Sequence, residues 1–70
     1  MTDHTYAITH LAGTSSESVD AAIRNGLKKA GETLRNMDWF EVSEIRGHLA
    51  HTSEVEYFQV TLKLGLRLEE

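Results

Sequence analysis

The sequence predicts a small α+β domain in which the elements follow the order strand-helix-strand-strand, with one amphipathic helix covering one face of a three-stranded sheet. Three observations carry this prediction: a β-branched run near the start, a long stretch with helical periodicity, and two final stretches in which apolar and polar residues alternate. Neither a proline nor a low-complexity tract interrupts the 70 residues. We therefore expect a single domain over residues 1–70.

The first strand is predicted for residues 5–11, a run rich in β-branched and aromatic residues. A glycine and a group of serines and threonines follow, which is typical of a strand end and a helix start. Thr14 with Glu17 has the spacing of a capping box. Ser15 with Ser18 is the alternative pair that would satisfy free amides at the start of the helix.

The helix is predicted for residues 16–37, about six turns. Its apolar residues recur at three- and four-residue spacing and leave the charged residues on the other side; they are Val19, Ala22, Ile23, Gly26, Leu27, Ala30, Leu34 and Met37. Gly26 and Gly31 each weaken a helix by about 1 kcal/mol relative to alanine. Because Gly26 falls on the apolar side, we expect the helix to approach the sheet closely there.

The second strand is predicted for residues 39–50, and its apolar positions shift from even to odd sequence numbers. This change of phase predicts a β-bulge near Ser43 and Glu44. A turn is expected at residues 51–54. The last strand, residues 55–68, then alternates without interruption, with apolar side chains at the even positions and mostly polar ones at the odd positions, so its register is well specified.

The length of this last strand predicts that the chain associates. A strand over residues 55–68 spans on the order of 45 Å, whereas a compact domain of this size has a radius of gyration of roughly 11 Å. The uncovered face of the sheet and a projecting end at residues 64–68 would then be exposed, and such edges are normally covered by partners. The alternative is that the strand bends back or frays after Lys63.

Composition excludes several other classes of protein. The chain has no cysteine, which removes disulfides and thiolate-zinc sites. Seven Lys and Arg against eleven Asp and Glu give a formal net charge of -4 without a basic cluster, which argues against a nucleic-acid partner. No run approaches the ~20 apolar residues of a membrane span, and the start lacks the pattern of a signal peptide. We therefore expect a cytoplasmic protein without a membrane partner.

The sequence contains no catalytic constellation. His48 and His51 are the closest histidine pair, but no third metal ligand accompanies them, and solvated loop histidines are the simpler interpretation. Nothing matches a nucleophile elbow or a glycine-rich phosphate loop. We therefore expect a protein that is not an enzyme and holds no metal.

Three residues of the predicted strands suit a planar polar ligand. The single tryptophan, Trp39, falls on the face away from the helix, where an interface anchor is favoured over ligand stacking on pattern alone. Gln59, on the face of the last strand away from the helix, offers two donors and an acceptor, or is a solvent-facing strand residue. Arg46 offers a planar fork for phosphate or carbonyl oxygens, or forms a surface ion pair with Glu44 or Glu56.

Taken together, the segments resemble the dodecin family, small flavin-binding proteins that assemble as hollow shells of twelve identical subunits. The resemblance covers nearly the whole chain and rests on the order and spacing of Gly13-Thr14-Ser15, Ala21-Ala22-Ile23, Asp38-Trp39-Phe40-Glu41-Val42, Ile45-Arg46-Gly47, and Phe58-Gln59-Val60-Thr61 leading into Gly65-Leu66-Arg67-Leu68. It implies a three-stranded antiparallel sheet partly wrapped around one amphipathic helix. This agrees with the order of elements predicted above.

The resemblance also implies a function and roles for the site residues. Trp39 would stack on the isoalloxazine ring of a flavin bound between chains, and Gln59 would hydrogen-bond the pyrimidine edge of that ring. Arg46 would contact the polar side of the ligand. A ribityl or phosphate tail would reach the turn at residues 50–56, where the sequence departs from the family, so His48 is a further candidate contact and the role of His51 stays open. The segment around Arg46 is similar to bacterial members, which favours FMN over riboflavin.

The expected function is therefore flavin storage and buffering, with quenching of excited flavin by Trp39 in a homododecamer. Coenzyme A is a further ligand that the resemblance leaves open. The alternatives are a flavin-dependent oxidoreductase and a ligand-free structural assembly module. The chain lacks a nicotinamide-binding segment and a poised acid or base, which disfavours the oxidoreductase.

Overall fold

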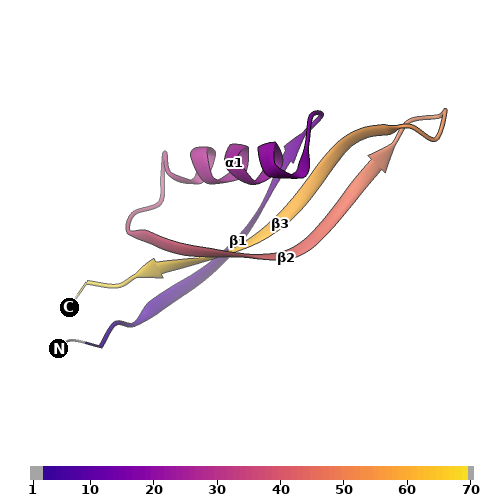
Figure 1. Ribbon diagram of the computed structural model, residues 1–70. Coiled ribbons are helices and arrows are strands. Elements are labelled where there is room, and N and C mark those ends of the chain that lie inside the picture. Colours follow the sequence, from indigo (N-terminus) through magenta and orange to yellow (C-terminus); the bar gives the residue numbers. More distant parts are fainter. Residues whose placement is uncertain (1–2, 70) are drawn as a thin grey trace.

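The computed structural model describes residues 3–69, which form four elements in the order β1 (Tyr6–Ser15), α1 (Val19–Ala30), β2 (Met37–Leu49) and β3 (Val55–Arg67) (Figure 1). The three strands make one sheet in the order β1-β3-β2, and both outer strands pair antiparallel with β3. The predicted α+β fold, strand-helix-strand-strand, is confirmed. Among residues 3–69, no helix has both the length and the apolar character that crossing a membrane requires.

The helix spans Val19–Ala30, so it begins three residues later and ends seven residues earlier than expected, and neither predicted capping pair forms. The Ser18 hydroxyl accepts a hydrogen bond from the Ala21 amide at 3.0 Å, and Ser15 accepts one from the Glu17 amide at 2.9 Å. At the other end, Asn36 adopts a left-handed conformation with φ 61 and turns the chain into β2. The prediction of helix to residue 37 was wrong because the apolar side chains of the connecting segment also pack on the core and so continue the helical spacing.

The core lies between α1 and one face of the central strand. Val60, Leu62 and Leu64 of β3 are fully buried, and burial of each such side chain contributes about 1.5–3 kcal/mol. The helix sits close to the sheet because two glycines meet: a Cβ on Gly13 would lie 2.9 Å from the Gly26 amide nitrogen and would overlap the backbone of α1. The predicted close approach at Gly26 is confirmed. The first strand, predicted for residues 5–11, continues to Ser15 because residues 12–15 also pair with β3.

The pairing of β2 with β3 is interrupted at three places. One irregularity lies between Val42 and Glu44, where the change of hydrophobic phase predicted a bulge, and the Ser43 hydroxyl donates to the Thr61 carbonyl oxygen there at 3.2 Å. A second lies between Met37 and Trp39 and a third between residues 48 and 49. Because a bulge adds a residue to one strand, each one resets which side chains face the helix.

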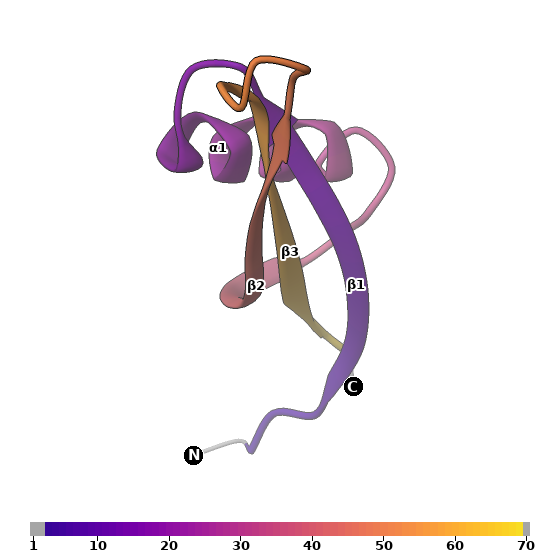
Figure 2. The same cartoon turned by 90° about the vertical axis from the view of Figure 1, so that its right-hand side faces the viewer.

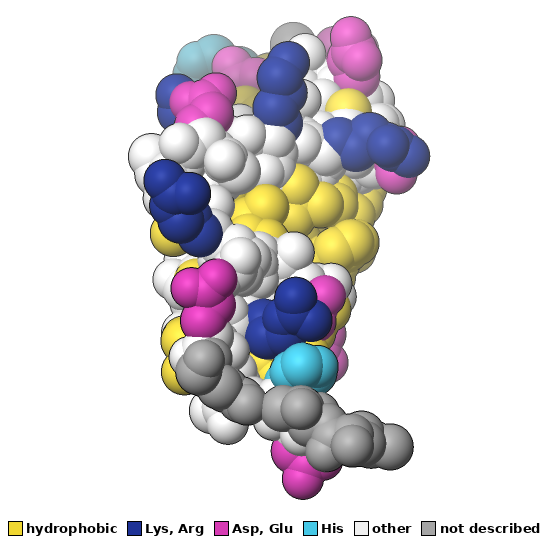
Figure 3. Space-filling model, turned by 90° about the vertical axis from the view of Figure 1, so that its left-hand side faces the viewer, with side chains coloured by type: hydrophobic (Ala, Val, Ile, Leu, Met, Phe, Trp, Pro, Cys, Tyr) yellow, Lys and Arg dark blue, Asp and Glu magenta, His cyan; other side chains and the backbone are white. Residues whose placement is uncertain are grey.

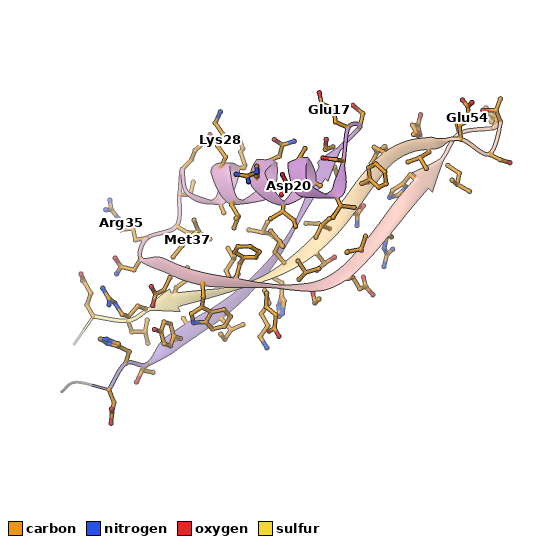
Figure 4. The ribbon with its side chains drawn as sticks, viewed as in Figure 1. Glu17, Asp20, Lys28, Arg35, Met37 and Glu54 are labelled. Carbon is orange, nitrogen blue, oxygen red and sulfur yellow. The ribbon has the colours of Figure 1, made fainter. Side chains whose placement is uncertain are left out.

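The molecule is elongated, with extents of 55 × 20 × 15 Å and a radius of gyration of 14.6 Å. The helix packs on β1 and β3 and lies over only part of the length of the strands (Figure 2). Helical side chains such as Lys28 point away from the sheet (Figure 4). Hydrophobic atoms also reach the surface at the end of the molecule seen in Figure 3, where charged side chains surround them.

The exposed apolar residues lie only in part where the sequence placed them. Residues 64–68 were expected to project, yet Leu64 and Gly65 are buried, because the helix covers one side and an indole covers the other. Ile8 and Leu68 are exposed, and further exposed large apolar side chains belong to the β2–β3 hairpin and to the helix side of β2, which α1 does not cover; these are Phe40, Val42, Ile45, Leu49 and Val55.

Candidate functional site

The predicted site residues share the face of the sheet opposite α1, which we call the outer face. Strand register and alternation assign its members. From β3 they are Tyr57, Gln59, Thr61, Lys63 and Gly65, and from β2 they are Trp39, Glu41, Glu44, Arg46 and His48. The prediction that Trp39 and Gln59 lie on the same face, away from the helix, therefore agrees with the register.

Trp39 lies across the central strand. It pairs with Gly65 of β3, and its indole occupies the space that a Cβ on Gly65 would take. The Trp39 side chain remains 37% exposed. The absence of a side chain on Gly65 thus lets a large aromatic plane rest against the sheet while part of the ring stays open to solvent.

A tyrosine from the far edge of the sheet stands beside this indole. The ring centroids of Tyr6 and Trp39 are 5.8 Å apart, with an angle of 59° between the planes. The Tyr6 hydroxyl donates a hydrogen bond to Asp38 Oδ2 at 2.6 Å. This hydrogen bond raises the pKa of Tyr6 above its ordinary value, with smaller contributions from burial and from the Asp38 charge, while Arg67 acts in the opposite direction.

Sequence reasoning missed Tyr6 and Asp38 as members of the site. They belong to strands that do not pair with each other, so their proximity depends on two separate registers with β3. A usable signal was nevertheless present, because alternation from Gly13 places Tyr6 on the outer face.

Gln59 is held by a histidine of the neighbouring strand. His48 Nε2 lies 3.0 Å from Gln59 Oε1, and since an amide oxygen only accepts, Nε2 carries the proton in this bond. The His48 ring stacks on Tyr57, with centroids 4.3 Å apart and 17° between the planes. His48 therefore orients Gln59 so that the amide NH₂ group is left for another acceptor.

Arg46 is the cross-strand neighbour of Gln59 and makes an ion pair with Glu44, with 2.8 Å between Arg46 Nη2 and Glu44 Oε1. This is one of the two ion pairs that the sequence left open. Both side chains are more than half exposed, so the pair contributes little to stability. The guanidinium keeps donors for a second acceptor.

The structure does not bring the predicted residues around one small volume. Gly65, under Trp39, and Gln59 are six positions apart on β3, which is about 20 Å along a strand. The Lys63–Glu41 ion pair, with 3.6 Å between its charged atoms, lies between them. One chain therefore presents an aromatic plane and an amide at separate places on the outer face. Across residues 3–69, no cluster of three or more His, Cys, Asp or Glu side chains suits a metal ion.

Comparison with known proteins finds relatives over nearly the whole chain. The family model described as Dodecin matches residues 5–69. A dodecin from Thermus thermophilus is 51% identical over 65 residues, which is 93% of this chain and 93% of that protein.

Solved structures give the same result. The dodecin from Streptomyces davaonensis has a TM-score of 0.90 at 52% identity, and the match covers 99% of this chain and 100% of that one. The dodecin from Streptomyces coelicolor has a TM-score of 0.90 at 50% identity, with 100% and 99% covered. The fold is thus that of small β-α-β-β proteins in which an antiparallel sheet packs on a single helix. Within that class, the chain belongs to the dodecin family, and the resemblance identified in the sequence is confirmed.

Proposed function

We propose that this protein stores and buffers flavin without catalysing a reaction: it binds FMN, or riboflavin, between the subunits of a hollow homododecamer and quenches the excited flavin through Trp39. Membership of the dodecin family supports the proposal. The observation that carries it is the position of Trp39, which rests on Gly65 with part of its ring exposed. An aromatic plane held in this way suits stacking on another planar ring.

The side chains on the outer face fit the chemistry of a flavin ring. The isoalloxazine is planar, and its pyrimidine edge alternates acceptor and donor atoms. Trp39 would supply the stacking plane. Gln59, oriented by His48 at 3.0 Å, would supply a donor and the second lone pair of its oxygen.

The separation of these groups supports a site shared by several chains. Trp39 and Gln59 are about 20 Å apart along the strand, which exceeds the reach of one ring system. Copies of the chain can bring the indole of one subunit beside the amide of another. A ring enclosed in this way between subunits leaves a second substrate little access, which favours storage over an oxidoreductase.

Self-association has its own support on the helix side of β2. Phe40, Val42 and Ile45 are 47%, 38% and 58% exposed and follow one another along the strand. Contiguous apolar surface of this kind normally marks a protein interface. The elongated shape, with an uncovered hairpin, gives a second reason for a copy of the chain to pack there.

Arg46 supports FMN as the preferred flavin. Arg46 pairs with Gln59 across the strands. Among residues 3–69, Glu44 is the only ion-pair partner of the Arg46 guanidinium. A phosphate group would compete with the Glu44 carboxylate for the same planar fork, in the bidentate geometry that guanidinium groups favour.

The direct test is to identify what the purified protein carries and binds. The absorption spectrum and mass of any released ligand would be recorded, and the stripped protein would be titrated with FMN while flavin fluorescence and particle mass are measured. We expect quenching on binding, a mass near twelve subunits, and loss of most affinity in Trp39→Ala with the assembly intact. Absence of FMN and riboflavin binding by an intact assembly would reject the proposal in favour of a structural module. Oxidation of NADH with turnover by the loaded protein would favour the oxidoreductase.

A further inference from the structure

The Tyr6–Asp38 hydrogen bond joins the two outer strands across the central one. Tyr6 belongs to β1 and Asp38 to β2, while β3 lies between them. The donor and acceptor are 2.6 Å apart. In the register, Tyr6 pairs with Arg67 of β3, and Trp39, the residue after Asp38, pairs with the neighbouring Gly65.

Asp38 also occupies a special place in the backbone. Met37 pairs with Leu66 and Trp39 pairs with Gly65, so Asp38 is the extra residue of a β-bulge. Bulges redirect the neighbouring side chain, and this one immediately precedes Trp39. The Tyr6 ring meanwhile stands 5.8 Å from the indole at an angle of 59°. The indole thus has Gly65 beneath it and Tyr6 beside it.

We propose that Tyr6 and Asp38 are positioning residues that fix the Trp39 indole across Gly65 in the ligand-free protein. Their hydrogen bond holds the bulge in one conformation and keeps the Tyr6 ring against the indole. A planar aromatic ligand then meets a stacking plane that is already ordered, and less conformational freedom is lost on binding. The part of this inference that concerns a ligand rests on the proposed flavin-binding function, whereas the part that concerns Trp39 does not.

Trp39 is the single tryptophan of the chain, so its emission reports on this position alone. The variants Tyr6→Phe and Asp38→Ala each remove the hydrogen bond. Asp38→Asn keeps an oxygen acceptor and serves as the rescue variant. Tyr57→Phe, which removes the hydroxyl of the chain's other tyrosine, is the matched control.

Trp39 emission anisotropy, near-ultraviolet circular dichroism and quenching by acrylamide would be measured on the ligand-free assembly. In Tyr6→Phe and Asp38→Ala we expect a higher quenching constant and a weaker dichroism band, and in Asp38→Asn values near those of the parent. The Kd for FMN should rise by about two- to tenfold in the first two variants, the scale of one lost hydrogen bond. Tyr57→Phe should leave the Trp39 signals unchanged.

An alkaline titration of the unmodified protein gives a second measurement if a variant fails to assemble. The charged groups that face the Tyr6 hydroxyl are Asp38 from β2 and Arg67 from β3. Ionisation of Tyr6 removes the hydrogen-bond donor and places the negative charges of Tyr6 and Asp38 together. The acrylamide quenching constant of Trp39 should therefore increase as the tyrosinate absorbance appears. The same titration of Tyr57→Phe assigns that absorbance to Tyr6.

Unchanged Trp39 signals in Tyr6→Phe, or an equal change in Tyr57→Phe, would overturn the positioning role. So would a Trp39 signal that stays constant through the ionisation of Tyr6. If only the flavin-binding function is wrong, the outcome differs. FMN would not bind to the parent or to any variant, but the Trp39 signals of the ligand-free protein would still distinguish Tyr6→Phe from Tyr57→Phe.

Discussion

Gly65→Ala is the sharpest single test of the site geometry. The added methyl group would overlap Cε2 and Cζ2 of the Trp39 indole, so the ring must leave its place. Among residues 3–69 no glycine has a positive φ, so the strand backbone itself accepts alanine. The change therefore acts on the outer face and leaves the helix side, where Val60, Leu62 and Leu64 form the core, in place.

The expected magnitudes separate binding from folding. Overpacking costs about 1–3 kcal/mol, and the stiffer unfolded chain offsets about 0.4–1 kcal/mol. The unfolding free energy should therefore fall by about 2.6 kcal/mol at most. Loss of a stacking plane worth ~1–3 kcal/mol would raise the Kd for FMN by about 5- to 150-fold. The ligand affinity thus suffers although Gly65 itself need not touch the ligand.

The assay is an FMN titration beside urea unfolding, with Gly47→Ala as the control. A Cβ on Gly47 would have its nearest neighbour, the Tyr57 carbonyl oxygen, at 3.9 Å, so this variant should keep the parent affinity. Unchanged FMN affinity and an unchanged Trp39 dichroism band in Gly65→Ala would refute the placement of the indole across the strand. Equal losses in both variants would show that the effect comes from strand glycines in general.

Four further predictions follow from the same geometry. Gln59→Ala should weaken FMN binding by about 1–3 kcal/mol, less than Trp39→Ala in parallel titrations, and an unchanged Kd would place Gln59 outside the site. Arg46→Ala should reduce FMN affinity much more than riboflavin affinity, and salt should weaken FMN selectively through screening; equal losses for both ligands would argue against a phosphate contact. The pKa of Tyr6 is raised in the folded state, so its hydrogen bond stabilises the fold fully below the ordinary tyrosine pKa of about 10. This stabilisation is lost as the pH rises through the folded-state pKa. The urea concentration at the midpoint of unfolding should therefore fall in alkali for the parent protein, and fall less for Tyr6→Phe. Gly13→Ala should prevent normal packing of α1, because its methyl group would overlap the Ala22 carbonyl oxygen, and circular dichroism showing a native thermal transition would contradict this.

Much of the fold could be predicted because the chain obeys simple periodicities. The alternation along β3 put Val60, Leu62 and Leu64 on one face, which α1 covers, although Leu64 was expected to project. The shift of phase in β2 located the bulge near Ser43. The end of the helix could not be predicted from hydrophobic periodicity. Leu34 keeps the helical spacing and packs on the core from a segment that is not helical, so periodicity alone cannot separate the two cases.

The candidate site was predicted in part for a related reason. Alternation placed Trp39 and Gln59 on one face, but it carries no information about distance along the strands. The contact between Tyr6 and Asp38 depends on the registers of both outer strands with β3. Such registers become visible only when all three strands are aligned together.

Under the proposed function, one face of β2 binds the ligand and the other face mediates assembly, so substitutions on the two faces should have different effects. Trp39, Arg46 and His48 belong to the outer face, whereas Phe40 and Ile45 belong to the side that α1 leaves uncovered. A flavin site shared between chains requires the association, but the association does not require the flavin. Damage to the uncovered side should therefore remove assembly and binding together, while damage to the outer face should remove binding alone. A single strand can contribute to both ligand binding and assembly because its side chains alternate between the two faces. The bulges at residues 38 and 43 determine which residues lie on each face.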